Sequence, residues 1–345
     1  MRMKRGALRL TALTIAGTLV LLAGCSSNGS GGEGTSGPSV STAPTASTGS
    51  TGPQPAEIEA TIEVGADPIG IASGEGALWV VNAEINAKRG SVSRIDPATN
   101  EVLAMIDVGS VPLEVAVGEG SVWVSNSDDD TVSRIDPTSD EVVADIDVCA
   151  APEGVAVADG SVWVACEDDG VVARIAPDTD EMVDQVDVGL QPRFVTFAFD
   201  DIWVSSYFDG TITRIDPANG KVLADITAEQ GPQIMAETGG LLWVSCTDVD
   251  HVQAIDPATN EVVATVETSE APDGLAFDGT SLWVATEIGH ELTGIDPSTQ
   301  RVVATATVAD HGLINANQVM VFESGSLWLP ILDDGVVLRV APPAS

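Results

Sequence analysis

The chain has 345 residues, 44% of them hydrophobic, and it carries 52 acidic against 14 basic residues, a formal net charge of −38 at pH 7. Charge of this sign and size repels phosphate groups, so it excludes nucleic acid as a partner and a basic face as the route to an anionic membrane. Only three histidines are present, which argues against a zinc centre.

Residues 1–24 are typical of a bacterial secretion signal. A basic start precedes an apolar run over residues 10–22, which is too short to span a bilayer comfortably. The segment ends in Leu-Ala-Gly-Cys at residues 22–25, which resembles a lipobox, and the resemblance implies cleavage before Cys25 and a lipid on its sulfur. The alternative is an ordinary signal peptide with an unrelated cysteine. With the lipid, the protein is expected on the extracytoplasmic side of the cell membrane.

The segment after Cys25 is predicted to be a linker. Residues 26–55 are almost entirely Ser, Thr, Gly and Pro, with Glu33 as the single charge, and this composition is typical of flexible chains. A coil of this length reaches roughly 30 Å from end to end. The linker would therefore hold the following domain clear of the lipid headgroups.

The rest of the chain is a sevenfold repeat marked by tryptophan. Successive tryptophans are 44, 40, 40, 40, 40 and 45 residues apart, and each marks a near copy of one sequence unit. Units of roughly 40 to 50 residues have the size of a four-stranded propeller blade. The sequence predicts an all-β domain over residues 56–345, a seven-bladed β-propeller with four antiparallel strands per blade. The tryptophans are Trp79, Trp123, Trp163, Trp203, Trp243, Trp283 and Trp328.

One full unit, residues 112–148, shows the four expected strands. Short runs rich in Val, Ile and Trp are separated by Gly, Pro, Asn and Asp, which is the pattern of successive hairpins rather than of helices. A proline stands eleven residues before the Trp in six of the seven units, and the last unit has Asn317 there. The strands are expected after Pro112 and over residues 122–126, 131–137 and 141–148.

The two ends of the domain complement each other. The last unit stops after its third strand at about Pro342, whereas residues 60–65 match a fourth strand, residues 104–109, of the following unit. We therefore expect the first strand to complete the last blade and close the ring, because closure removes open edges that invite aggregation. The alternative is an open stack of hairpins, which would need capping repeats that these ends do not resemble.

Three cysteines, Cys149, Cys166 and Cys246, remain after lipidation in a compartment where disulfides persist. The turn between the first two strands of the third unit would bring Cys166 opposite Pro152, with Cys149 just ahead of it. Cys166 and Cys246 occupy the same place in units two apart, beyond the Cα separation of about 7 Å that a disulfide can span. The expected pair is Cys149 and Cys166, and three free buried thiols are the alternative.

Features that recur in the units are assigned to the scaffold. An Asp-Pro pair follows the third strand in five units, where it would start a turn. Arginine recurs two residues ahead of this turn position. Five copies favour structural pairing over five active sites. The arginines are Arg94, Arg134, Arg174, Arg214 and Arg339.

Positions that vary on this constant frame are the candidates for a binding site. The residue after each repeat proline should line the central funnel, on the face formed by the loops before the first strands and after the second strands. Its identity changes around the ring from Ile69 and Leu113 to the polar members. We predict that the polar members, namely Glu153, Arg193, Gln233, Asp273 and Gln318, contact a ligand.

The fourth unit departs most from the acidic pattern. Arg193, Phe194, Tyr207 and Phe208 put a cation and aromatic rings into an acidic rim, and exposed aromatics and arginine are typical recognition anchors. The alternative is that Phe194 and Phe208 only fill a gap between blades.

The acidic loops offer carboxylates suited to magnesium or calcium, but none has the spacing of a calcium-binding EF-hand loop. No metal ligand is therefore assigned from spacing. The loop acids are Asp128, Asp129, Asp130, Glu167, Asp168, Asp169, Asp209, Asp248, Asp250, Glu287, Glu291, Asp333 and Asp334.

Trp79-Val80-Val81-Asn82 resembles the Tyr-Val-Thr-Asn strand of YVTN-type propellers. The wider unit, Pro-x-Gly-Ile-Ala-x-Gly followed by Gly-x-Leu-Trp-Val, is similar to the virginiamycin B lyase group of seven-bladed propellers, over residues 56–345. That resemblance implies a magnesium ion and a His and Glu pair for proton abstraction. The nearest candidates are Glu287, His290, Glu291 and His311. The strand position where the lyase's acidic residue is expected holds Thr286 and Ile331 instead.

These observations favour a lipid-anchored propeller that binds a protein or small molecule of the cell envelope through its funnel face, as a monomer. The enzyme alternative is a magnesium-dependent lyase or a lactone hydrolase, and a third hypothesis is a sensor domain of a membrane signalling system. A lyase needs a histidine and carboxylates converging on one point of the funnel, whereas a binding module needs only an accessible patch.

Overall fold

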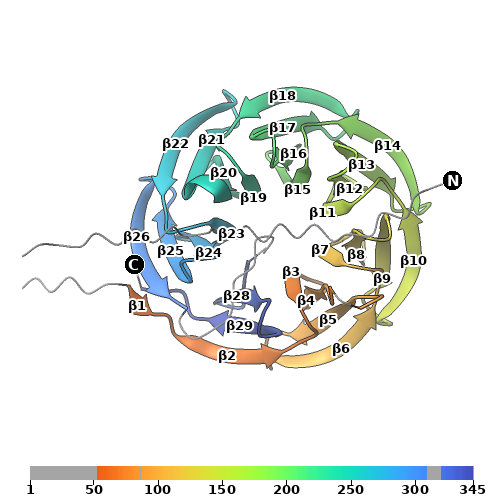
Figure 1. Ribbon diagram of the computed structural model, residues 1–345, viewed down its shortest axis with the longest axis horizontal. Coiled ribbons are helices and arrows are strands. Elements are labelled where there is room, and N and C mark those ends of the chain that lie inside the picture. Colours follow the sequence, from red (N-terminus) through yellow and green to blue (C-terminus); the bar gives the residue numbers. More distant parts are fainter. Residues whose placement is uncertain (1–52, 86, 309–319, 345) are drawn as a thin grey trace, which may run out of the picture. The chain divides into compact units, whose positions relative to one another are not determined.

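The computed structural model describes residues 53–85, 87–308 and 320–344. Within these residues the strands form seven sheets arranged around a central axis (Figure 1). Each sheet contains four antiparallel strands, placed side by side in order from the axis to the outside of the ring. The seven-bladed propeller predicted from the tryptophan spacing is confirmed. We number the blades in the order of their tryptophans and call the strands of each blade inner, second, third and outer.

The first four blades use consecutive strands. Blade 1 holds β3 (Pro68–Gly74), β4 (Ala77–Asn82), β5 (Ser91–Asp96) and β6 (Glu101–Asp107). Blade 2 holds β7 (Pro112–Gly118), β8 (Ser121–Asn126), β9 (Thr131–Asp136) and β10 (Glu141–Asp147). Blade 3 holds β11 (Pro152–Ala158), β12 (Ser161–Cys166), β13 (Val171–Ala176) and β14 (Glu181–Asp187). Blade 4 holds β15 (Pro192–Ala198), β16 (Asp201–Ser206), β17 (Thr211–Asp216) and β18 (Lys221–Thr227).

The last three blades carry the irregular features. Blade 5 holds β19 (Pro232–Thr238), β20 (Leu241–Cys246), the 3-10 turn η1 (Thr247–Val249), β21 (His251–Asp256) and β22 (Glu261–Glu267). Blade 6 holds β23 (Pro272–Phe277), β24 (Leu282–Thr286), β25 (Glu291–Asp296), β26 (Arg301–Thr307) and the added β1 (Gln54–Pro55). Blade 7 holds β27 (Val321–Glu323), β28 (Ser326–Ile331), β29 (Val336–Val340) and β2 (Ile58–Glu63).

Burial changes from the second strand to the outer strand as the repeat pattern requires. Every residue of β4, β8 and β12 is buried, because both faces of a second strand pack against neighbouring blades. The outer strands alternate instead, as in β10 and β18, where exposed residues flank half-buried and buried ones. Alternation of this kind is typical of a strand with one face on the core and one in water.

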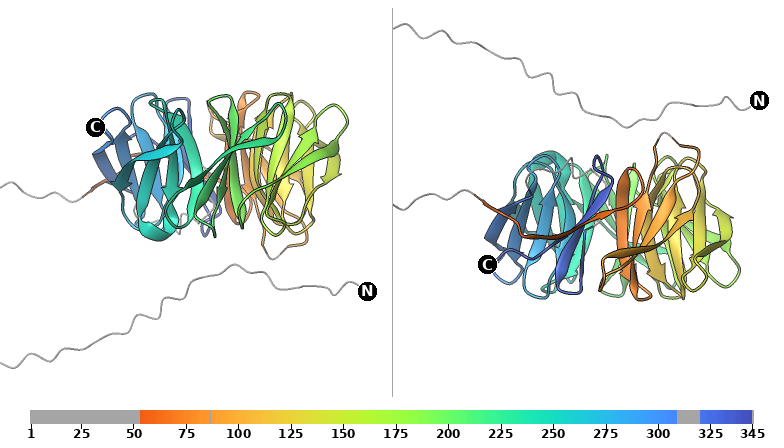
Figure 2. Two further views of the ribbon diagram at one scale, coloured as in Figure 1. Left: turned by 90° about the horizontal axis from the view of Figure 1, so that it is seen from above. Right: turned by 90° about the horizontal axis from the view of Figure 1, so that it is seen from below.

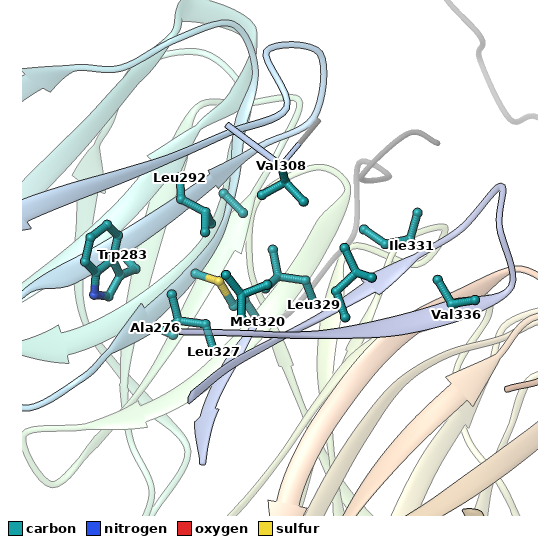
Figure 3. Close-up of a cluster of buried hydrophobic side chains, with 12 residues drawn as sticks. Ala276, Trp283, Leu292, Val308, Met320, Leu327, Leu329, Ile331 and Val336 are labelled. Carbon is teal, nitrogen blue, oxygen red and sulfur yellow. The ribbon is translucent and has the colours of Figure 1, made fainter. Parts of the chain in front are cut away.

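The seven tryptophans lie at the centres of the interfaces between blades, with at most 1% of each side chain exposed. In five blades the indole N–H donates to the backbone carbonyl five residues earlier, for example Trp123 to Gly118 at 3.1 Å. Burial of the ring supplies packing energy, and the N–H needs this partner when it leaves water. Figure 3 shows the equivalent cluster between blades 6 and 7, with Trp283 beside Leu292, Met320 and Leu327.

Four of the five repeated arginines connect their blade to the next one. All five guanidinium groups lie over the tryptophan ring of their own blade, at 4.9 to 5.4 Å from its centroid. Arg94 then reaches Asp140 and Arg134 reaches Asp180, both at 2.8 Å, in the turn between the third and outer strands of the next blade. Structural pairing, the interpretation drawn from their repetition, is what these contacts show.

Blade 7 closes the ring with the first long strand of the chain. β2 pairs antiparallel with β29, with Ile62 opposite Val337, and Ile62 joins the buried cluster that contains Trp328. Closure by the N-terminal strand, predicted from the unmatched ends, is confirmed. The sequence did not indicate β1, which adds a short parallel strand outside β26.

Cys149 and Cys166 form a disulfide, with 5.8 Å between their Cα atoms. Pro152 lies opposite Cys166 in the ladder of β11 and β12, the register expected from the turn between them. Cys246 is a buried free thiol. Within the described ranges, the structure contains no helix with the length and apolar character of a membrane span.

Deletion of residues 56–65 should prevent ring closure, because blade 7 then loses β2 and two strand edges are left open. We expect the variant to aggregate, as measured by size-exclusion chromatography and thermal melting. Deletion of ten linker residues, 31–40, is the length-matched control and should leave both measurements unchanged. A soluble, monomeric and cooperatively melting 56–65 deletion would refute the closure argument.

Candidate functional site

One end of the propeller carries the loops that vary between blades. The loop before each inner strand and the loop after each second strand lie together there (Figure 2), and we call this end the funnel face. A backbone hydrogen bond of 2.8 to 3.0 Å joins the two loops in blades 1 to 6, for example from Tyr207 N–H to the Gln191 carbonyl. The repeat therefore fixes the loop backbones and leaves their side chains free to vary.

Part of the acidic rim belongs to this scaffold. The carboxylates of Asp129, Asp169 and Asp209 accept hydrogen bonds of 2.6 to 2.9 Å from backbone N–H groups of the neighbouring loop. The repetition of this contact in blades 2, 3 and 4 assigns these three residues to loop structure. Their negative charges nevertheless remain on the exposed face.

The predicted inner ring lies deeper than a rim. Glu153, Gln233 and Asp273 have at most 8% of their surface exposed. Gln233 donates to Thr247 at 3.2 Å and to Asp273 at 3.4 Å. Gln318 lies outside the described residues. The axial cavity beside this ring measures only about 20 Å³, which is room for about one water molecule. The described polar residues of the inner ring therefore lie buried beneath the funnel face, and the space beside them is too small for a ligand larger than water.

Glu114, two residues after Pro112, is a buried member of this ring that the sequence analysis did not single out. It is 6% exposed, and burial raises its pKa to about 8, with the negative charge of Asp273 adding to the effect. Glu114 therefore keeps its proton at neutral pH. The sequence did contain a signal for Glu114, because this carboxylate stands at the position where blades 1 and 3 have glycine, Gly70 and Gly154.

Arg193 places a positive charge beside the buried acidic residues of the inner ring. Its guanidinium lies 3.9 Å from Glu153 and 3.6 Å from Glu167, and it stacks on Tyr207 at 4.1 Å from the ring centroid. Burial raises the pKa of Glu153 well above its usual range, and the charge of Arg193 opposes that rise. Tyr207 in turn donates its hydroxyl to Asp248 at 2.7 Å. These two predicted anchors are held by internal contacts.

The two phenylalanines of blade 4 have different environments. Phe194 packs against two buried clusters, one on each side of blade 5, as in the gap-filling alternative. Phe208 is 73% exposed, and Leu190 beside it is 57% exposed. The backbone N–H of Phe208 donates to the Leu190 carbonyl at 3.4 Å, so the two loops hold these apolar side chains together.

Leu190 and Phe208 line a hollow of the funnel face. Its volume is about 320 Å³, near the lower end of the range for ligand pockets. The opposite wall is the loop Glu167 to Gly170 of blade 3, which contributes three carboxylates. The site geometry is therefore an apolar patch on blade 4 that faces an acidic loop on blade 3.

The catalytic candidates lie in blade 6. Burial raises the pKa of Glu287, and the buried Nδ1 of His290 has no hydrogen-bond partner. The Glu291 backbone N–H donates to the Thr286 hydroxyl at 3.1 Å. His311 lies outside the described residues. Among the residues with described positions, no three His, Cys, Asp or Glu side chains are placed to hold a metal ion, so this part of the chain does not supply a three-ligand protein site for the magnesium that the lyase resemblance implies.

These features define the class of protein, a seven-bladed β-propeller with a varied loop face. No family model matches the chain, and no curated protein sequence matches it. Among solved structures it is similar to a chain of Kuenenia stuttgartiensis hydrazine synthase, with a TM-score of 0.70 and 17% identity over 86% of this chain and 99% of that one. At this identity the likeness shows the fold alone, and propellers host many unrelated functions.

Glu114 provides a pH test of the buried ring. Because its folded pKa of about 8 lies above its ordinary value of 4.5, its contribution to stability should fall as pH rises from about 4.5 to about 8. Each pKa unit is worth about 1.4 kcal/mol, so the fall is on the order of 5 kcal/mol. Glu114→Gln should remove this part of the pH dependence in urea unfolding. Exposed Glu141→Gln is the control, and identical pH profiles for wild type and Glu114→Gln would contradict the assignment.

Proposed function

We propose that this chain is an extracytoplasmic, lipid-anchored propeller that binds an envelope component through its funnel face. The observation that carries the proposal is the pair of exposed apolar side chains, Leu190 and Phe208, beside a hollow of about 320 Å³. Exposed aromatic groups next to a hollow are typical of recognition surfaces. The rigid loop pairing beneath them supports this proposal, since a preordered surface loses less entropy on binding.

The location belongs to the same proposal. Its support is the lipobox-like sequence that ends at Cys25 and the uncharged linker that follows it. A disulfide between Cys149 and Cys166 is consistent with an oxidising compartment. The relationship to the YVTN-type and virginiamycin B lyase-like propellers is likewise a proposal, supported by the repeated sequence unit.

The lyase alternative has less support in the site geometry. Glu287 and His290 are on blade 6, but the described residues do not provide a ligand set for the implied metal. We therefore derive no catalytic step. The two hypotheses differ in the blade that carries the functional residues. The proposed binding depends on blade 4, whereas a lyase would depend on blade 6.

The double variant Leu190→Ser/Phe208→Ser should lose binding, because it removes the apolar anchors without touching the core. Capture of partners from detergent-solubilised cell-envelope fractions, with the lipidated full chain as bait, should fall about tenfold or more. The matched control is Leu103→Ser/Met105→Ser on β6, where the side chains are 51% and 54% exposed. Equal capture by both variants would contradict funnel-face binding. A turnover activity lost in His290→Ala/Glu291→Ala would favour the lyase.

Cys25→Ser should abolish lipid anchoring, because the thiol that accepts the lipid is gone and a short apolar segment alone is a weak anchor. The expected result is loss of the lipid mass by mass spectrometry and a shift in detergent partitioning. Cys246→Ser, which removes a buried thiol, is the matched control. An unchanged mass and unchanged partitioning of the Cys25 variant would contradict anchoring through this residue.

A further inference from the structure

We propose that the hollow between blades 3 and 4 receives a basic protein segment, with an aliphatic or aromatic residue seated on Leu190 and Phe208 and flanking Lys or Arg side chains against the blade 3 loop. This inference rests on the proposed function and names the chemistry of the partner.

The apolar half of the hollow is preordered by hydrogen bonds between its two loops. Leu190 N–H donates to the Asp209 carboxylate at 2.6 Å, and Phe208 N–H donates to the Leu190 carbonyl at 3.4 Å. These contacts lock both loop backbones while 57% and 73% of the two side chains remain exposed. An apolar side chain of a partner would cover surface that water now wets.

The acidic half is equally prepared. Glu167, Asp168 and Asp169 follow Cys166 directly, and the disulfide to Cys149 fixes the start of this loop. Asp169 accepts a hydrogen bond from Ala150 N–H at 2.9 Å, which orients its carboxylate. Asp168 and Asp169 are exposed, so cationic groups can approach them from solvent.

The rest of the described surface does not offset this charge on the funnel face. Residues 53–85, 87–308 and 320–344 contain ten Lys and Arg residues. Five of them stack on tryptophans and point toward the opposite turns, and Lys221 and Arg301 begin outer strands at that same end. The remaining three are Lys88, Arg89 and Arg193, and Arg193 is held by Glu153 and Glu167. A cationic partner would be steered to this face and an anionic one repelled.

The openness of the hollow favours a segment of a protein over a small molecule. Small-molecule sites enclose most of the ligand surface. This hollow is shallow by comparison, because Phe208, which forms part of its wall, is 73% exposed. The axial cavity below, of about 20 Å³, offers no deeper pocket. One apolar side chain with charges on either side matches both the size and the two-sided chemistry of the hollow.

The test uses the lipidated full chain in detergent and three fluorescent eight-residue peptides. The first has Leu-Phe between two Lys-Arg-Lys segments, the second has Ser-Ser in place of Leu-Phe, and the third has Glu in place of every Lys and Arg. By fluorescence anisotropy at about 50 mM salt, the first should bind at least about tenfold more tightly than either other peptide. Raising the salt to about 500 mM should weaken its binding several-fold.

Two double variants then locate the binding. Leu190→Ser/Phe208→Ser should weaken binding of the first peptide about tenfold, and Asp168→Asn/Asp169→Asn about fivefold at low salt. Their controls are Leu103→Ser/Met105→Ser and the charge-matched Asp178→Asn/Asp200→Asn at the opposite end. Each control should change the affinity by less than about twofold.

Several results would overturn the inference. Equal binding of the acidic peptide, equal effects of the control variants, or full displacement of the first peptide by an equal concentration of phenethylamine would each do so; the last would identify a small organic cation as the occupant. If the peptides fail to bind while envelope capture still depends on Leu190 and Phe208, the basic-segment inference fails and funnel-face binding stands. If capture is also insensitive to those residues, the proposed function fails with it.

Discussion

The contact between a buried tryptophan and an arginine that reaches the next blade is the interaction on which this ring depends. Five of the seven blades contain the stacked arginine, and four of these arginines, all but Arg174, hydrogen-bond to the next blade. Its last copy joins the last blade to the first, because Arg339 lies over Trp328 and bonds to Asn100 of blade 1 at 3.1 Å. Arg339 also bonds to Glu59 of β2 at 3.0 Å. One repeated contact therefore links four blades to their neighbours and secures the closing strand.

These arginine contacts lie toward the turns opposite the funnel face. The two ends of the propeller therefore differ in role, since one end holds the structural contacts and the other carries the varied loops. The turn end holds most of the positive charge and the repeated Asp-Pro turns, where hydrogen bonds from Ser298 and Thr299 lower the pKa of Asp296 to about 2. The funnel end keeps a fixed backbone and varied side chains. Division of this kind lets loops change chemistry without loss of the scaffold.

Sequence reasoning reached the fold because the repeat samples the same environment seven times. The tryptophan spacing, the unmatched ends and the register of Pro152 with Cys166 follow from strand periodicity alone. The depth of a side chain does not follow from it. Glu153 and Phe208 both lie at varied positions, yet one is 8% and the other 73% exposed, because depth depends on how adjacent blades approach the axis. Glu114 escaped notice because its burial depends on the close approach of the neighbouring blade at Gly70.

The buried acidic centre and the exposed acidic rim have opposite consequences for recognition. Burial raises the pKa values of Glu114 and Glu153, and the protonation of Glu114 and the positive charge of Arg193 beside Glu153 reduce the negative charge at the axis. The rim acids Asp168 and Asp169 are exposed to solvent. The field that a partner meets is therefore set by the rim beside blade 4. Leu190 and Phe208 lie where that field and the exposed apolar surface coincide, so the proposed partner would be selected by charge and apolar contact together.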